Sequence, residues 1–202
     1  MTPAPPAVGV AAFDFDGTMI RGDSFVPFLV RAVGPGRFGQ QMVISSPATA
    51  QAYRAGRRDA SKAVLVRRFL AGYPADRLAA LGESYGTQLA RRIRPAMAER
   101  VAWHRRQGHR LVMVSASFEI YLAATGRALG FDGVLATRLE VGPEGLLTGR
   151  LDGPNVRGAE KAVRLKAWLA AELDGTAWRL WAYGDSAGDR ELLAMADHPT
   201  HV

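Results

Sequence analysis

Near its amino terminus the chain joins an apolar segment to a pair of acids: residues 8–18 read VGVAAFDFDGT. Val8 to Phe13 is a short apolar run of the type that forms a strand buried on both faces of a parallel sheet. Asp14 and Asp16 follow it, so strand alternation directs both carboxylates to one side. At about 4 Å two carboxylates repel by roughly 1 kcal/mol in water and about 4 kcal/mol at an effective dielectric of 20. We expect a cation nearby or a proton on one acid, although two solvated aspartates in a turn would explain the pair, taken alone, equally well.

Two more apolar runs end in polar residues and are followed by helix-like sequence. The runs are Arg110–Val114 and Trp178–Ala182, and the helical stretches after them are Glu119–Leu129 and Asp189–Ala196. Strands that alternate with helices predict an α/β fold with a Rossmann-like parallel sheet and right-handed crossovers. Ligands of such sheets bind beyond the carboxyl ends of the strands, where these runs lead to Ser115 and to Asp185.

The connection between the first two strands is about 95 residues long, far more than a simple link from a strand to its helix. Glycines and a proline divide it into helical stretches, which are Ser24–Val33, Arg37–Tyr53, Asp59–Leu70 and Ala75–Ile93. We predict a helical cap subdomain at residues 21–94, inserted into a core domain made of residues 1–20 and 95–202. Residues 134–151 should hold another sheet strand and then a hairpin.

The basic residues are concentrated in the predicted cap. The 202 residues include 26 Lys plus Arg and 19 Asp plus Glu, a formal charge of +7, and residues 21–94 hold 13 basic and 4 acidic residues, a net charge of +9. Several basic residues recur at helical spacing and can share one face; they are Arg57, Arg58, Lys62, Arg67 and Arg68. Such a face would favour polyanionic or lipid phosphates and peripheral contact with an anionic membrane. Only three of the 26 are lysines, and arginine bias also follows from genomic base composition, so solvated helix faces are the alternative and nucleic acid is not indicated as a partner.

Other features of composition exclude several classes of protein. Cysteine is absent, which excludes disulfides, thiolate metal sites and a cysteine nucleophile. Residues 1–6 have neither the basic nor the apolar region of a secretory signal, and no apolar run approaches the roughly 18 residues of a membrane-spanning helix. We therefore expect a cytoplasmic globular protein; its oligomeric state is not indicated by the sequence.

Three further groups of residues can take part in the same chemistry as the first pair of aspartates. Residues 184–189, GDSAGD, bring two more acids to a strand end and can complete an oxygen cage suited to Mg²⁺, although a helix cap in a turn explains them as well. Residues 115–117, SAS, can offer a hydroxyl and backbone N–H groups to an anion, or can cap the next helix. Lys161 at the head of a predicted helix is, taken alone, a solvated charge; beside the other groups it can neutralise a phosphate.

The order of these four elements resembles that of the haloacid dehalogenase (HAD) superfamily of phosphatases, from Val8 to His201. The DxDGT motif at residues 14–18 and the GDSxxD motif at residues 184–189 form a highly specific pair. A helical insertion directly after the first motif resembles the C1 cap of subfamily IB, the group that contains phosphoserine phosphatase. Residues 149–161 also resemble the phosphatidylglycerophosphatase C-like branch of that subfamily.

This resemblance implies a Mg²⁺-dependent phosphatase that forms an aspartyl phosphate. Asp14 would be the nucleophile, and Asp16 would protonate the leaving oxygen and then activate water. Asp16 favours phosphate chemistry, since the dehalogenase members of the superfamily lack this second aspartate. The resemblance implies that Mg²⁺ is held by Asp14, Asp185 and the backbone carbonyl of Asp16, with Asp189 either a direct ligand or a residue that orients the waters of the metal. It also implies that phosphate is bound by Gly17, Thr18, Ser115, Ala116 and Lys161.

Some positions depart from the phosphoserine phosphatase pattern. Asp23 lies where those enzymes carry a glutamate that contacts the substrate amine, and Gly188 lies where they usually have asparagine. The resemblance thus implies substrate contact by Asp23 in the cap, yet it does not support phosphoserine as the substrate. The chain also stops soon after His198, where such relatives continue through another strand, as expected of a truncated product.

Our leading interpretation is hydrolysis of a small-molecule or lipid phosphomonoester. A phosphotransferase or mutase would use the same intermediate and would differ in passing the phosphoryl group to a hydroxyl instead of to water. A third hypothesis is a basic adaptor that binds lipid or nucleic acid while its catalytic core is idle. Intact acidic residues in both motifs argue against an idle core.

Overall fold

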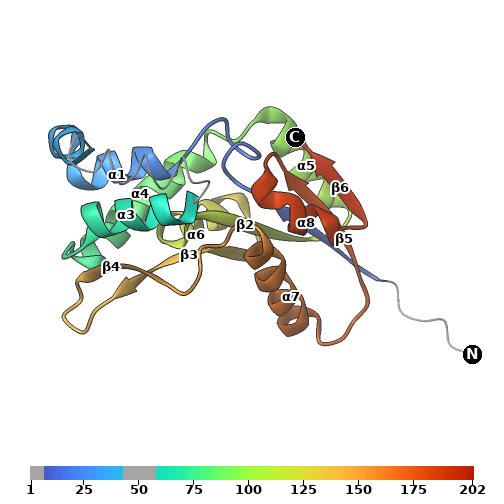
Figure 1. The fold of residues 1–202 in the computed structure, drawn as a ribbon. Coiled ribbons are helices and arrows are strands. Elements are labelled where there is room, and N and C mark those ends of the chain that lie inside the picture. Colours follow the sequence, from blue (N-terminus) through green and yellow to red (C-terminus); the bar gives the residue numbers. More distant parts are fainter. Residues whose placement is uncertain (1–6, 43–57) are drawn as a thin grey trace, which may run out of the picture.

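A computed structural model describes residues 7–42 and 58–202, apart from the Arg58 side chain, and confirms the α/β fold (Figure 1). Its sheet has six strands in the order β4-β3-β2-β1-β5-β6, and the neighbouring strands are parallel except for β3 and β4. The strands are β1 Val8–Phe13, β2 Arg110–Phe118, β3 Gly133–Val141, β4 Leu147–Asp152, β5 Trp178–Gly184 and β6 His198–His201.

Helices cover the sheet and fill the predicted insertion. Those before the second strand are α1 Phe25–Val33, α3 Arg58–Leu70, α4 Ala75–Ala90 and α5 Pro95–Arg106. Those after it are α6 Glu119–Leu129, α7 Ala159–Leu173 and α8 Arg190–Ala194, with a 3-10 turn at Ala187–Asp189. Residues 35–42 are also helical. In Figure 1 the helices α1, α3 and α4 gather on the left, and β5, β6 and α8 lie on the right.

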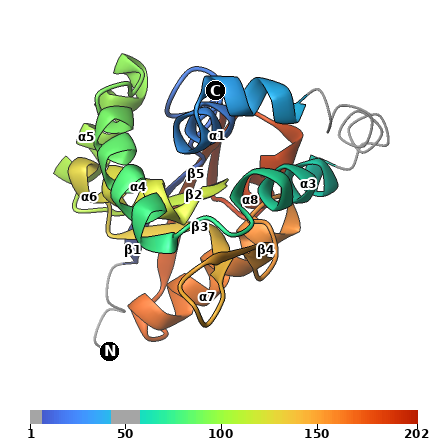
Figure 2. The ribbon, with the colours of Figure 1, turned by 90° about the vertical axis from the view of Figure 1, so that its left-hand side faces the viewer.

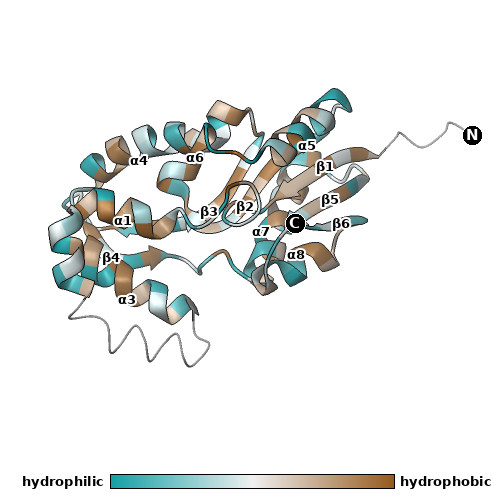
Figure 3. Cartoon of the chain, turned by 90° about the horizontal axis from the view of Figure 1, so that it is seen from above, coloured by the Kyte–Doolittle hydropathy of each residue, from teal (hydrophilic) through white to brown (hydrophobic). Residues whose placement is uncertain are grey.

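The apolar run of β1 divides its residues between the two faces of the sheet. Val10 and Ala12 pack in the cluster that includes the inner faces of α7 and α8. Ala11 and Phe13 pack in the other cluster, with residues of α5 and α6. A strand with helices on both faces must be apolar at every position, and Figure 3 shows β1 in the pale to brown colours of apolar residues, whereas β6 at the edge is hydrophilic.

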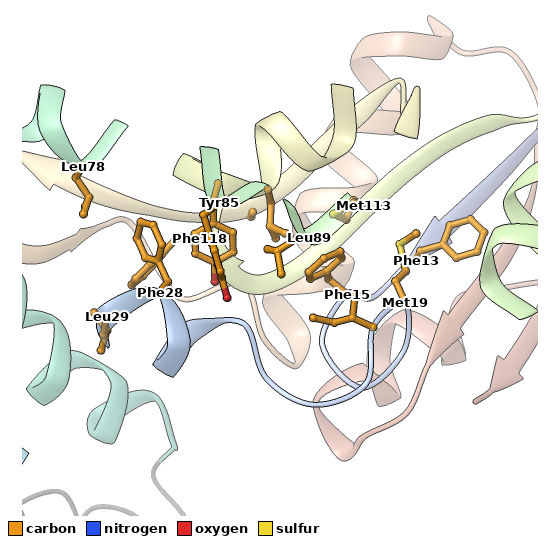
Figure 4. Packing of buried hydrophobic residues seen from close by; sticks show 14 of the residues in the cluster. Phe13, Phe15, Met19, Phe28, Leu29, Leu78, Tyr85, Leu89, Met113 and Phe118 are labelled. Atoms are coloured by element: carbon orange, nitrogen blue, oxygen red, sulfur yellow. The ribbon is translucent and has the colours of Figure 1, made fainter. Parts of the chain in front are cut away.

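The insertion shares one hydrophobic cluster with the core. Phe28 of α1 and Tyr85 of α4 belong to the same buried cluster as Phe13 and Met113 of the sheet (Figure 4). Phe118, at the end of β2, contacts the Phe28 ring at a centroid distance of 6.5 Å and links the two parts. The α4 helix packs along α6, and α3 packs on β4 (Figure 2). The described residues of the cap therefore form no hydrophobic cluster separate from that of the sheet, and the proposed domain boundaries stay a prediction.

Most predicted elements are present, and three segments differ from the prediction. The strand β2 continues through residues 115–117, which we expected to follow it, because Ser115 pairs with Ala136 and Phe118 pairs with Thr137 around an irregularity. Residues 95–106 and 198–201, to which no element was assigned, form α5 and β6. The predicted helix at residues 37–53 is helical as far as residue 42, and its remainder lies outside the described residues.

Candidate active site

The predicted site residues meet at the carboxyl ends of three adjacent strands. Asp14 follows β1, Ser115 lies near the end of β2, and Asp185 follows β5. The order β2-β1-β5 puts the Asp14 segment in the middle, where its backbone N–H donates to the Tyr183 carbonyl at 2.9 Å. The sheet topology thus gathers residues that are 171 positions apart in the sequence at one edge.

Asp14 and Asp189 share the ammonium group of Lys161. The Lys161 Nζ lies 2.5 Å from Asp14 Oδ1 and 2.5 Å from Asp189 Oδ1, and all three side chains are buried. Burial raises the pKa of Asp14 to about 6, and the charge of Lys161 opposes that rise. Burial would lower the pKa of Lys161, but the two carboxylates outweigh it and raise the pKa. At neutral pH this arrangement holds a charged lysine against a largely ionised Asp14.

Asp16 is hydrogen-bonded to the segment that leads into the first helix of the cap. Its Oδ1 accepts from the Ser24 N–H at 2.9 Å, and its Oδ2 accepts from the Ser24 hydroxyl at 3.0 Å and from the Ser117 hydroxyl. The Ser24 hydroxyl also bonds Tyr121 at 3.0 Å. Burial raises the pKa of Asp16 to about 7, against the opposing effect of the hydrogen bond from Ser117. The expected proton on one member of the pair is therefore most readily carried by Asp16.

Gly17 and Thr18 connect the first motif to Asp185. Gly17 has a φ of +81°, and a Cβ there would lie 2.1 Å from Asp185 Oδ2, so only glycine leaves space for that carboxylate. The Thr18 hydroxyl lies 3.3 Å from both Asp14 Oδ2 and Asp185 Oδ1. Both residues position the acids; their predicted contact with phosphate stays a prediction.

Asp189 is fixed by a capping box at the 3-10 turn. The Ser186 N–H and hydroxyl both donate to Asp189 Oδ2, at 3.0 and 2.8 Å, while the Gly188 N–H donates to Ser186 Oγ at 3.2 Å. Burial raises the pKa of Asp189, but Lys161 and the bonds from Ser186 outweigh it, so the pKa lies below its ordinary value. Asp189 is therefore an ionised carboxylate at neutral pH.

Three of the predicted metal ligands lie together. The carboxylates of Asp14, Asp185 and Asp189 offer oxygens within 4.8 Å of one another. Asp185 is exposed, whereas the other two are buried. An all-oxygen donor set with one open side suits a hard cation such as Mg²⁺, which keeps several waters when it binds protein. The residues present fit this metal.

A small cavity of about 130 Å³ lies between these acids and the end of β2. Its lining includes Asp14, Asp16, Ser115, Ala116 and Lys161, as predicted, and it also includes Arg157. The Ser115 hydroxyl accepts from the Ser117 N–H at 3.1 Å, which holds the end of β2 in shape. Arg157 was not predicted, because an arginine in a loop carries no pattern that separates it from the many solvated arginines of this chain.

A larger cavity of about 490 Å³ adjoins the small one and lies beneath the cap. Asp16, Ala116 and Arg157 line both cavities. Asp23 lines the larger one, but its two carboxylate oxygens accept from the N–H groups of Phe25 and Val26 at 3.2 and 2.8 Å. Asp23 thus shapes the start of α1, and its predicted substrate contact stays a prediction.

Lys62, which we predicted to share a basic helix face with four arginines, also lines the larger cavity. The lysine is partly buried and donates to the Ala116 carbonyl and, at 2.9 Å, to Asn155 Oδ1. Arg67 and Arg68 of the same helix are exposed. Arg57 and the Arg58 side chain lie outside the described residues, so the predicted membrane contact of this cluster stays a prediction. Within the described part of the chain, none of the helices has the length and hydrophobicity needed to cross a membrane.

Comparison with known proteins identifies the class of protein that this sheet and site define. Residues 11–194 match the model of the haloacid dehalogenase-like hydrolase family, and the chain belongs to that family. Protein CicA of Caulobacter vibrioides is 37% identical over 193 residues, which cover 93% of this chain and 83% of that protein.

Other relatives narrow the assignment within the family. A phosphoserine phosphatase of Halobacterium salinarum is 31% identical over 192 residues, 93% of this chain and 82% of that protein. The crystal structure of a protein of unknown function from Bordetella pertussis has a TM-score of 0.75 to this chain. Its sequence is 25% identical, and the match covers 94% of this chain and 87% of that protein. The chain is a phosphoric monoester hydrolase of the phosphoserine phosphatase-like group, which confirms the predicted resemblance.

Proposed function

We propose that this enzyme hydrolyses its phosphomonoester through an aspartyl phosphate formed on Asp14. The observation that carries the proposal is that two acids with different partners line one cavity: Asp14 contacts Lys161, and Asp16 contacts Ser24. Asp14 is held ionised beside Lys161, and Asp16, with a pKa raised to about 7, keeps a proton available at neutral pH. An ionised nucleophile and a protonated acid are the two groups that the first half of the reaction needs.

In the first half, an Asp14 carboxylate oxygen forms a bond to phosphorus while the bond to the leaving oxygen breaks. Asp16 gives its proton to that oxygen, so the product leaves as an alcohol. In the second half, the Asp16 carboxylate takes a proton from water, whose oxygen attacks phosphorus. The Asp14–phosphorus bond breaks, inorganic phosphate leaves, and both aspartates return to their starting states.

Charge neutralisation comes from the residues around Asp14. Lys161 lies against the nucleophile and offsets its repulsion of an anionic phosphate. Ser115 and Ala116 line the cavity, and the Ser115 hydroxyl and the Ala116 N–H would donate to phosphoryl oxygens. Asp14, Asp185 and Asp189, with the backbone carbonyl of Asp16, would hold Mg²⁺. The bound metal would supply further neutralisation of charge and would orient the phosphate.

Trapping of the intermediate tests this proposal. Wild-type protein is mixed with a ³²P-labelled phosphomonoester and Mg²⁺, and the reaction is quenched in acid. The labelled protein is then treated with hydroxylamine, which cleaves acyl phosphates. We expect labelled protein that loses its label to hydroxylamine, and no label on Asp14→Asn. Asp76→Asn, at an exposed position of α4, is the control. Label of equal amount on Asp14→Asn would overturn the assignment.

The same measurement separates hydrolysis from transfer. Addition of glycerol or another hydroxyl acceptor reports how the intermediate divides between water and alcohol. We expect inorganic phosphate to account for most of the product, with water as the acceptor that Asp16 activates. Phosphorylated acceptor as the main product would assign the enzyme as a phosphotransferase.

A further inference from the structure

The larger cavity is where the alcohol part of the substrate must lie if the proposed function holds. Asp16, the proton donor to the leaving oxygen, lines both cavities, so a phosphate beside Asp14 directs its ester oxygen toward the space of about 490 Å³. The charged groups on the walls of this space therefore select the alcohol. Three of them are acids, Asp16, Asp23 and Asp59, and two are cations, Lys62 and Arg157.

The acids on the walls already have hydrogen-bond donors from the protein. Asp16 accepts from Ser24 and Ser117. Asp23 accepts from two backbone N–H groups at the start of α1. Asp59 accepts from the Asn155 Nδ2 at 2.6 Å. A cationic ligand would have to compete with these donors.

The two cations form no direct ion pair among the described residues, although Asp16, Asp23 and Asp59 act on Lys62, and Glu191 interacts with Arg157, at longer range. Lys62 donates to two neutral oxygens, the Ala116 carbonyl and the Asn155 side-chain carbonyl, and it forms no ion pair in the described part of the chain. The Arg157 guanidinium forms neither a hydrogen bond nor an ion pair with any residue that the structure describes, although it lies against both cavities. Neither cation contacts a carboxylate directly, and both line the cavity, so an anionic ligand there can contact them.

Neighbouring groups hold the Lys62 ammonium at this place. Its nitrogen lies 4.6 Å from the centroid of the Phe118 ring and 5.5 Å from that of Phe25. The Thr137 hydroxyl donates to Asn155 Oδ1 at 2.8 Å, which fixes the amide so that its oxygen faces Lys62. Burial lowers the pKa of Lys62 to about 7, so an anion that binds here would also restore its charge.

The choice of lysine is itself informative in this chain. Only three of its 26 basic residues are lysines, at positions 62, 161 and 166, and two of these line the cavities. A compact ammonium fits between two rings and two carbonyl oxygens, whereas the planar guanidinium of arginine is larger. The lysine at position 62 therefore fits this place more closely than an arginine would.

We infer that Lys62, assisted by Arg157, is a specificity-determining residue that selects phosphomonoesters whose alcohol carries a second anionic group. The inference rests on the proposed function, because it places the alcohol in the larger cavity. The second anion is a carboxylate or a phosphate, since both accept from an ammonium and a guanidinium in the same way.

A pair of nearly isosteric substrates tests the inference. 3-Phosphoglycerate carries a carboxylate where sn-glycerol 3-phosphate carries a neutral hydroxymethyl group, and glycerol 1,3-bisphosphate carries a phosphate. We expect kcat/KM of wild type to favour one or both anionic compounds, and their ranking identifies the anion. In Lys62→Met the ratio of anionic to neutral substrate should fall by about tenfold to a hundredfold, the usual effect of one charged hydrogen bond. Lys62→Arg should restore part of the ratio.

Further variants separate selection from a structural role. Lys166→Met removes the exposed lysine of α7 and should leave the ratio as in wild type. Asn155→Asp puts a carboxylate of nearly the same shape against Lys62 and should abolish the preference without removing the lysine, which keeps the test available if Lys62→Met fails to fold. A lysine that only supports the end of β2 would lower kcat/KM for all three substrates by one common factor. A ratio unchanged in both Lys62→Met and Asn155→Asp would overturn the inference.

Binding measurements distinguish this inference from the proposed function. Calorimetry of the three compounds with Asp14→Asn, and with Asp14→Asn combined with Lys62→Met, gives the affinity ratio without turnover. Hydrolysis of p-nitrophenyl phosphate that requires Asp14, together with an affinity ratio that does not depend on Lys62, would reject only the inference. Turnover that does not require Asp14 would reject the proposed function, while an affinity ratio that depends on Lys62 would still support the anion site.

Discussion

Asp185 occupies the space that a side chain on residue 17 would need: a Cβ on Gly17 would lie 2.1 Å from Asp185 Oδ2. The first motif and the last motif are thus in close contact at the Asp185 carboxylate. Any residue with a Cβ at position 17 must displace the exposed member of the acid cluster. This relationship leads to the first prediction.

Gly17→Ala should impair metal binding more than it impairs folding. We expect an unfolding free energy lower by about 1 kcal/mol, because alanine is strained at a φ of +81°, and a clear rise in the Mg²⁺ concentration for half-maximal activity. Gly22→Ala is a matched control, since Gly22 has a φ of +82° and open space around its α-carbon. Equal Mg²⁺ requirements in the two variants would show that the displacement of Asp185 has no effect on the site.

Asp14→Asn should abolish phosphate release, and Asp16→Asn should lower it by about 10²- to 10⁴-fold, the usual contribution of a proton donor. Both should remain folded, because each replaces a buried acid with a neutral group of the same shape. Steady-state release from p-nitrophenyl phosphate, with circular dichroism to check folding, measures the effect. Retention of more than about a tenth of wild-type activity in Asp14→Asn is incompatible with a nucleophilic role.

Removal of the metal should silence the enzyme. EDTA should stop turnover, Mg²⁺ should restore it, and excess Ca²⁺ should inhibit, because Ca²⁺ accepts looser geometry with more ligands. Asp185→Ala should raise the Mg²⁺ requirement at least about tenfold, since even residues in the outer shell of a metal site contribute that much. Asp76→Ala, remote in α4, should not. Undiminished activity in EDTA would contradict the proposed Mg²⁺ site.

His104 should make stability depend on pH in a defined direction. It is fully buried, its ring nitrogens lie 2.8 Å from His109 Nδ1 and from the Tyr183 hydroxyl, and burial lowers its pKa to about 4. The unfolded chain takes up this proton below about pH 6.5 and the folded chain only near pH 4, so the contribution of His104 to stability is present above pH 6.5 and is lost as the pH falls toward 4.

The measurement compares unfolding free energies at pH 7 and pH 5 by urea denaturation. Between these values wild type should lose roughly 1 to 2 kcal/mol more than His104→Gln, which has no titrating ring. His201→Gln, at an exposed position, should follow wild type. Identical pH slopes for wild type and His104→Gln would mean that the buried ring does not resist protonation.

The sequence predicted the central strands, and the position of the two acidic motifs at strand ends, because the signals for both are local. A strand buried on both faces needs an unbroken apolar run, and β1 is such a run. The end of β2 was missed because small polar residues have no strand pattern and stay extended only through pairing with β3. Helix α5 was missed because its sequence, with basic residues in its last turn, has only a weak apolar face.

The side chains that complete the site could not be predicted for a different reason. Lys62 lies in the same helix as the exposed Arg67 and Arg68, and only the tertiary fold places its ammonium over the Phe118 ring. The serines that bind Asp16 come from residues 24 and 117, which the fold alone brings together. Pairings between distant segments have no local sequence signature.

The hydrophobic cluster that joins the insertion to the sheet has a consequence for protein engineering. A cap grafted from a relative would replace Phe28 and Tyr85 but would meet the original Phe118 and Tyr121, whose rings now pack against them. The insertion therefore cannot be exchanged on its own. A chimera needs the matching face of α6 and the end of β2 from the protein that donates the cap. Substrate range in this enzyme is thus tied to the packing of its core, and it can be altered more safely by single changes on the cavity wall than by recombination.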